Sequence, residues 1–322
     1  MSLLDRVMCI CFMTALAHPG QAQTYPNKSI RLIVTFAAGG GADFMGRLIG
    51  QKLGEGYRQT VVVDNRAGAG GAIGNEVVAR APPDGYTLLL GAAGPLVIAP
   101  ALYQKLPYDT VRDYAPITLL ASAAFALTTH PSVPATSVKE LLALARANPG
   151  KLNYGSSGTG GAPHLAGELF QTMAKVKLVH VPYKGLSPAI IDLIGGQLDL
   201  IFADLNLVGP HFESGRLRGI AVTSAKRSSL IPGLPTVAEA GIGSYQAGTW
   251  YGVLAPAATP RDIVVKLNAD INRILGNNDV RERLATQGAE GTQMTPEQFA
   301  AFIRSELEKW ARLVKSANIR LE

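Results

Sequence analysis

Short apolar runs alternate with helical patterns along most of the chain. The runs are rich in β-branched residues or leucine, which predicts buried strands, and the segments between them repeat apolar residues every three or four positions, as on one face of a helix. The predicted strands cover residues 30–36, 61–63, 86–90, 117–127, 153–155, 179–181, 198–202, 220–222 and 250–255. Strands that alternate with helices favour an α/β fold with mostly parallel sheets and flanking helices.

Three glycine-rich loops lie between a predicted strand and a predicted helix. They cover residues 37–41, 64–71 and 156–161, and residues 91–94 are a candidate fourth loop. Such loops expose backbone N–H groups at the positive end of a helix, where an anion can bind. Any single loop could be an ordinary turn. Because ligands of open α/β sheets gather beyond the carboxyl ends of the strands, we expect the three loops to share one site for a small anion.

Helix starts are marked by capping residues. Ser137 and Glu140 form a capping box, and Thr236 and Glu239 predict a short capped helix. Thr259 and Thr295 each precede a proline, which predicts a threonine cap with proline at the first helical position.

Four polar residues near the loops are candidates for ligand binding or for a structural role. Asp43 can cap the helix after the first loop, and His164 can contact a ligand or brace the third loop. Asp204 ends a strand, where it can hold a ligand ammonium group, orient a water molecule or cap the next helix. Arg66 can pair with a carboxylate, although we favour a solvated loop charge. We expect His130, His180 and His211 to be structural.

The motifs of several catalytic or cofactor-binding classes are incomplete. The last glycine of a dinucleotide fingerprint is replaced by Ile73 in one loop and by Pro163 in another, and a phosphate loop is missing. Thr159 interrupts the hydrolase pattern Gly-x-Ser-x-Gly. No His-x-x-x-His pair supports a metal site. We therefore expect no cofactor, no metal and no catalytic residue.

Length and composition favour two lobes. The chain has 322 residues, of which 47% are hydrophobic and 17% charged, and its formal net charge is +6. A single core stops growing at about 250–300 residues, so the chain is expected to form two. No run of five or more Lys or Arg residues is present, which argues against nucleic acid binding.

The first 22 residues predict an export signal. Arg6 precedes an apolar segment at 7–17, and Gly20 and Ala22 frame a cleavage site. The apolar segment is shorter than the roughly 20 residues of a membrane-spanning helix. Cleavage after Ala22 would remove Cys9 and Cys11, so the mature protein would have no thiol for a disulfide, a metal or nucleophilic catalysis.

Taken together, these segments resemble the Bug receptors, the periplasmic solute-binding component of tripartite tricarboxylate transporters. The resemblance covers nearly all of the mature chain and rests on the joint occurrence of several segments in order. The segments are Tyr25–Pro26, Ile30–Val34, Phe36–Asp43, Val62–Gly71, Pro83–Leu88, Gly158–Leu165 and Val181–Gly185.

The resemblance implies a two-lobed, type II periplasmic-binding-protein-like fold of the Venus flytrap kind. Lobe 1 would comprise residues 24–122 and 248–322, and lobe 2 residues 123–247. A small carboxylate, such as a dicarboxylate, a tricarboxylate or an acidic amino acid, would bind between the lobes and close them. The implied partners are a large and a small membrane transporter subunit, and we expect a periplasmic monomer.

The loops and the resemblance together define the expected ligand-binding residues. They are Phe36, Ala37, Gly39, Gly40, Asp43, Asn65, Gly68, Ala69, Gly70, Gly71, Ser157, Thr159, Gly160, His164 and Asp204. Two other functions stay open at this point. A sensor subunit for a membrane signalling partner would use the same site, and an enzyme acting on a small organic acid would need a nucleophile and base that the motifs do not supply.

Overall fold

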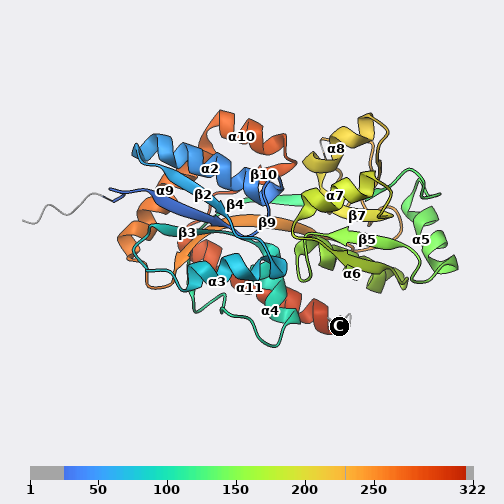
Figure 1. Cartoon of the computed structure of the whole chain (residues 1–322), viewed down its shortest axis with the longest axis horizontal. Coiled ribbons are helices and arrows are strands. Elements are labelled where there is room, and N and C mark those ends of the chain that lie inside the picture. Colours follow the sequence, from blue (N-terminus) through green and yellow to red (C-terminus); the bar gives the residue numbers. More distant parts are fainter. Residues whose placement is uncertain (1–24, 229, 317–322) are drawn as a thin grey trace, which may run out of the picture.

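The computed structural model describes residues 25–228 and 230–316, and two α/β halves lie side by side in it (Figure 1). The predicted export signal and both cysteines lie outside the described residues. We call the half that contains the first strands lobe 1 and the other half lobe 2.

Lobe 1 is built on a sheet in the order β2-β1-β3-β9-β4. The parallel pairing expected from the sequence joins β1 (Ile30–Val34) to β2 (Val61–Asn65) and to β3 (Thr87–Ala92). Helices cover both faces of this sheet (Figure 1). They are α2 (Gly41–Tyr57), α9 (Arg261–Gly276) and α10 (Asn278–Ala285) on one face, and α3 (Ala72–Ala79), α4 (Ala99–Leu102) and α11 (Pro296–Ser316) on the other.

Lobe 2 repeats this arrangement around its own parallel strands. In it β5 (Asn153–Ser156) pairs with β6 (Val179–Pro182) and β7 (Leu200–Asp204), and β8 (Arg218–Val222) pairs with β4. The helices of lobe 2 are α5 (Val138–Ala147), α6 (Ala162–Ala174), α7 (Leu186–Ile194) and α8 (Leu205–Glu213).

One long strand, β4 (Tyr114–Thr129), belongs to both sheets. It pairs antiparallel with β9 (Gly248–Pro256) as far as Ala124 and with β7 from Phe125 onward, and the short β10 (Ala289–Gly291) pairs with its middle. The change of partner lies close to the expected boundary at residues 122 and 123. The lobe boundaries themselves stay a prediction.

Residues 91–94, the candidate fourth loop, do not form a loop, although Ala92 and Gly94 lie on the same side as the other loops and line a shared pocket. Strand β3 continues to Ala92, because Gly91 pairs with Gly252 of the neighbouring β9, and a π-helical segment (Gly94–Ile98) follows. Sequence patterns within β3 carry no information about this distant partner.

The caps of α5 and α11 are confirmed. The Ser137 hydroxyl accepts the Glu140 N–H at 3.2 Å, and the Thr295 hydroxyl accepts the Gln298 N–H at 3.2 Å. The expectation for Thr259 is wrong: Pro260 caps α9, and the buried Thr259 hydroxyl has no partner within the described part of the chain.

The short helix expected after Thr236 is also wrong. Thr236 and Glu239 exchange the reciprocal bonds of a capping box, at 3.0 and 3.1 Å, but the chain forms only a turn there. One pair of local bonds is too little to stabilise a further helical turn.

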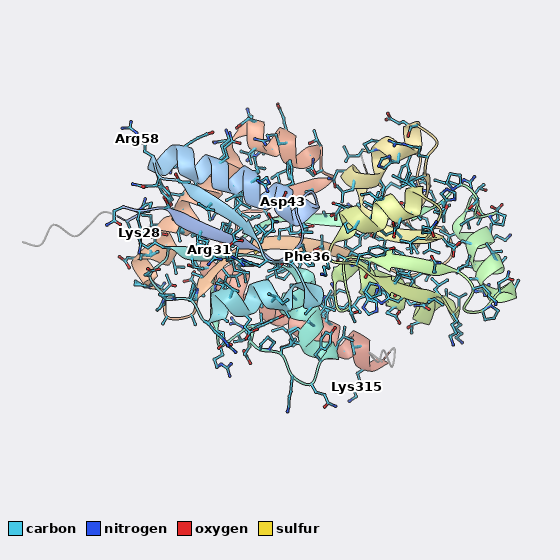
Figure 2. The ribbon with its side chains drawn as sticks, in the orientation of Figure 1. Lys28, Arg31, Phe36, Asp43, Arg58 and Lys315 are labelled. Atoms are coloured by element: carbon cyan, nitrogen blue, oxygen red, sulfur yellow. The ribbon has the colours of Figure 1, made fainter. Side chains whose placement is uncertain are left out.

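Buried hydrophobic side chains form clusters in both lobes. Figure 2 shows the described side chains on the ribbon. Among the helices of residues 25–228 and 230–316, none combines the length and the apolar character needed to cross a membrane.

Candidate functional site

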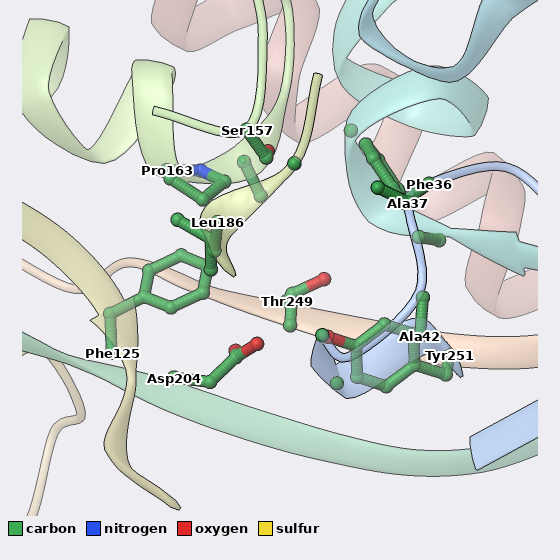
Figure 3. Close-up of a pocket in the computed structure, with 16 residues that line it drawn as sticks. Phe36, Ala37, Ala42, Phe125, Ser157, Pro163, Leu186, Asp204, Thr249 and Tyr251 are labelled. Atoms are coloured by element: carbon green, nitrogen blue, oxygen red, sulfur yellow. The ribbon is translucent and has the colours of Figure 1, made fainter. Parts of the chain in front are cut away.

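A small, partly enclosed pocket of about 40 Å³, called the enclosed pocket below, lies where the two lobes meet (Figure 3). Its lining comes from the carboxyl ends of strands in both lobes. Phe36 and Ala37 follow β1, Ser157 follows β5, and Asp204 ends β7. Side chains of β4 and β9 complete the wall between them. The pocket therefore has the position that the parallel strands predict for a ligand site.

Four helices begin at this pocket. Their first residues contribute to the lining: Gly41 and Ala42 of α2, Ala162 and Pro163 of α6, Leu186 of α7, and the residue just before α8. The first N–H groups of a helix have no partner within the helix and carry the positive end of its dipole. None of the described lining residues is Lys, Arg or His. An anion in the pocket would therefore meet helix starts rather than a cationic side chain.

The structure distributes the expected site residues over two neighbouring pockets. Five of them line the enclosed pocket: Phe36, Ala37, Gly40, Ser157 and Asp204. Gly68, Ala69, Gly70 and Thr159 line a second, more open pocket of about 590 Å³, which Ser157 also borders. The remaining residues line neither pocket: Gly39, Asn65, Gly71 and Gly160 are part of the loops, and Asp43 and His164 lie on the helices that follow them.

Two residues behind the first loop hold its main chain. The Asp43 carboxylate accepts the Gly39 N–H at 3.0 Å and pairs with Arg47 at 2.9 Å. Asn65 donates its amide N–H to the Phe36 carbonyl at 3.0 Å. Asp43 is not the helix cap expected from the sequence, because Gly40 occupies that position. Burial raises the pKa of Asp43, but bonds from Arg47 and Gly39 outweigh it and lower the pKa.

His164 braces the third loop. Its Nδ1 accepts the Gly160 N–H at 3.1 Å, and its ring stacks on His180 with centroids 3.9 Å apart. His180 in turn bonds the Ser156 hydroxyl at 2.7 Å. Burial, with the neighbouring His180, lowers the pKa of His164 to about 3, and burial lowers that of His180 to about 4. Both rings are therefore neutral above pH 5 and support the loop as neutral groups.

The second loop meets the third loop directly. A Cβ on Gly70 would lie 2.1 Å from the Thr159 carbonyl oxygen, and Gly70 has a positive φ of +61°. Gly71 lies behind this contact, where its carbonyl accepts the Asn75 amide at 2.8 Å. Only glycine allows the two main chains to approach so closely.

Asp204 is the buried acid of the enclosed pocket. Its side chain is only 4% exposed, and burial raises its pKa to about 6, although bonds from the Gly41 N–H and the Tyr251 hydroxyl lower it. The other oxygen, Oδ1, is buried without a partner among the described residues. Asp204 precedes α8 but makes no side-chain capping bond, so the capping alternative is excluded.

The sequence analysis missed Phe125, Thr249 and Tyr251, which enter the pocket from β4 and β9. Their side chains reach it through strand pairing that no local pattern reveals. Gly185 could have been found, since it joins β6 to α7 as a further strand–glycine–helix unit. Arg66 pairs with Asp64 at 3.0 Å and is half exposed, in agreement with a solvated loop charge.

The sequence profile described as "Tripartite tricarboxylate transporter family receptor" matches residues 45–319. The protein BugT of Bordetella pertussis is 37% identical over 324 residues, which cover 100% of this chain and 99% of that protein. The match to BugT extends over both lobes and the pocket between them.

Solved structures show the same fold. The periplasmic binding protein BugD is 35% identical with a TM-score of 0.88, covering 92% of this chain and 100% of its own. Rpa4515 of R. palustris with adipate is 37% identical with a TM-score of 0.89, and the match covers 92% of this chain and 99% of Rpa4515. MatC of Rhodopseudomonas palustris with bound malate is 32% identical with a TM-score of 0.86, and the match covers 90% of this chain and 100% of MatC.

These matches give the chain the α/β fold of periplasmic binding proteins, and they make it a binding protein rather than an enzyme. The chain belongs to the tripartite tricarboxylate transporter receptor family, also known as the TctC or Bug family.

Proposed function

We propose that this protein captures a small carboxylate in the enclosed pocket, in the periplasm, and delivers it to the two membrane subunits of a tripartite transporter. The observation that carries the proposal is the convergence of four helix starts on a pocket without a cationic side chain. Such a site suits an anion that is held and released unchanged. Relatives bound to adipate and to malate support the ligand class.

Main-chain contacts are strong enough for this role. Each helix start contributes about 0.3–1 kcal/mol toward an anion, or up to about 2 kcal/mol when partly buried. Charge-assisted hydrogen bonds add roughly 1.5–3 kcal/mol each. A few such contacts, less the cost of ordering the solute and closing the lobes, reach the roughly 8 kcal/mol of micromolar binding.

We assign the expected site residues two kinds of role. Those that line the pockets would contact the solute or its waters. The others, which line neither pocket, would hold the loops in shape through the bonds described above; they are Gly39, Asp43, Asn65, Gly71, Gly160 and His164. The solute would bridge the lobes and stabilise their closed arrangement, which the membrane subunits would recognise.

Native mass spectrometry of protein purified without refolding tests the proposal first, because a retained solute shows its mass directly. Isothermal titration calorimetry with adipate, malate and shorter acids follows. Gly40 lines the pocket, and a Cβ placed on it meets no atom within 4 Å. Gly40→Glu would place a carboxylate at the start of α2 and should weaken binding at least tenfold.

Gly56→Glu is the matched control. Gly56 lies near the other end of α2 and also has open space around its Cβ, so the variant carries the same added charge away from the pocket. It should bind as the wild type does. Equal affinity of both variants, or recovery of a chemically altered acid, would contradict the proposal.

A further inference from the structure

Asp204 is the one carboxylate among the described residues that line the enclosed pocket. In Figure 3 its side chain points toward Thr249 and Tyr251, between the lining groups of the two lobes. The carboxylate accepts bonds from the Gly41 N–H and the Tyr251 hydroxyl. Its Oδ1 is buried and has no partner in the described part of the chain. A buried acceptor without a partner costs about 1–3 kcal/mol, so the site is incomplete without a donor.

This acid changes what the pocket can hold. Asp204 uses the N–H of Gly41, the first residue of α2, and it directly precedes α8. The α2 start thus already donates to a carboxylate of the protein itself, and a solute carboxylate at the start of α8 would lie next to Asp204. A solute carboxylate is left with the starts of α6 and α7. A second carboxylate placed at Asp204 would meet a like charge, with no described Lys, Arg or His in the lining to offset it.

We propose that Asp204 binds an ammonium group of the solute, so that the preferred ligand is an amino acid rather than a dicarboxylate. The proposal rests on the function proposed above, in which the pocket binds a carboxylate. The solute carboxylate lies at the starts of α6 and α7, and its ammonium group donates to Oδ1.

An ammonium group fits better than a hydroxyl group because it supplies charge as well as a donor. A buried ionised carboxylate needs a counter-charge, and the Asp204 site offers none from the lining. Of the other lining groups around Asp204, Phe125, Pro163 and Leu186 do not titrate, and burial keeps the Tyr251 hydroxyl neutral by raising its pKa. The charge at this point is therefore decided by Asp204 and the solute.

Pairs of acids that differ only at one end test the proposal by calorimetry. The pairs are succinate and β-alanine, glutarate and 4-aminobutanoate, and adipate and 5-aminopentanoate. In each pair an ammonium group replaces one carboxylate on the same carbon chain. In at least one pair, wild-type protein should bind the amino acid at least tenfold more tightly than the diacid.

Asp204→Asn should reduce this ratio at least tenfold, because the amide is neutral and itself donates. Glu213→Gln is the control: Glu213 is exposed at the other end of α8, so the same negative charge is removed outside the pocket. In Glu213→Gln the ratio of the affinities for the amino acid and the diacid should equal that of the wild type. An unchanged ratio in Asp204→Asn would overturn the proposal.

Proton uptake by the wild type gives a test that needs no variant. Titrations near pH 7 in buffers of different ionisation enthalpy should show that a diacid binds with uptake of close to one proton, whereas an amino acid binds with none. Tighter binding of the diacid in every pair overturns this inference and leaves the proposed function standing. Failure of all six acids and of malate to bind refutes the proposed function and this inference with it.

Discussion

Replacing Gly70 by alanine tests whether the two lobes must meet for a solute to bind. Gly70 lies on the second loop of lobe 1, and Thr159 lies on the third loop, in lobe 2. A Cβ on Gly70 would lie 2.1 Å from the Thr159 carbonyl oxygen, whereas Cβ contacts under 3.0 Å do not occur. The loops must therefore separate by at least 0.9 Å to accommodate the methyl group.

This separation is incompatible with the observed contact between the second and third loops. The atom that obstructs the methyl group is a backbone oxygen, which cannot rotate away as the end of a flexible side chain can. If binding requires closure, apparent affinity falls by the factor by which the closed population falls. A closed state destabilised by about 1.4 kcal/mol already lowers affinity tenfold, so we expect at least a tenfold loss for Gly70→Ala by calorimetry.

Gly215→Ala separates this effect from backbone strain. Gly215 has nearly the same positive φ, +68° against +61° for Gly70, but a Cβ there meets no atom within 4 Å. In both variants an alanine has to adopt a left-handed backbone conformation, which costs roughly 1–2 kcal/mol. Only the Gly70→Ala methyl group also obstructs the contact between the lobes. Binding by Gly70→Ala within twofold of Gly215→Ala would refute the reasoning.

Three further predictions concern stability, each measured by urea unfolding. Because burial raises the pKa of Asp204 from 3.8 to about 6, the folded protein loses stability as the pH rises from 3.8 to 6. Asp204→Asn should therefore increase the free energy of unfolding by as much as about 3 kcal/mol at pH 7.5 and leave it unchanged near pH 3.5. Because the pKa of His164 is lowered from 6.5 to about 3, the folded protein loses stability as the pH falls through this range. His164→Asn keeps an acceptor for the Gly160 N–H but does not titrate, so its free energy of unfolding should depend less on pH between 6.5 and 3. Ser137→Ala should cost about 1 kcal/mol at every pH, because it removes the α5 cap.

The strand–glycine–helix units could be predicted because they are local. A β-branched run, a glycine cluster and an amphipathic segment each depend on neighbours in sequence, and the structure has strands and helices at all three predicted loops. The caps at Ser137 and Thr295 follow from spacing of the same kind. Thr259 failed because its alternative, a cap at Pro260, differs by a single residue, which is within the normal uncertainty of helix ends.

The composition of the pocket could not be predicted because it depends on pairing between distant strands. Tyr251 reaches Asp204 only because β9 lies between β3 and β4. The sequence also does not show which pocket each loop lines. The first loop lines the enclosed pocket, and the second loop lines the more open pocket. A glycine loop predicts free N–H groups, but only the folded chain shows which of them remain available.

Asp43 and Asp204 both accept an N–H group near the start of α2, but they differ in how their charges are balanced. Asp43 holds the Gly39 N–H and is neutralised by Arg47, so its charge is balanced within the protein and it contributes to loop geometry. Asp204 holds the Gly41 N–H, and no cation lies among the described lining residues, so its charge is unbalanced until something binds. Stability alone would favour an amide at position 204. A carboxylate whose charge is balanced only by a bound partner favours a solute that supplies an ammonium group, and it penalises one that supplies a second anion.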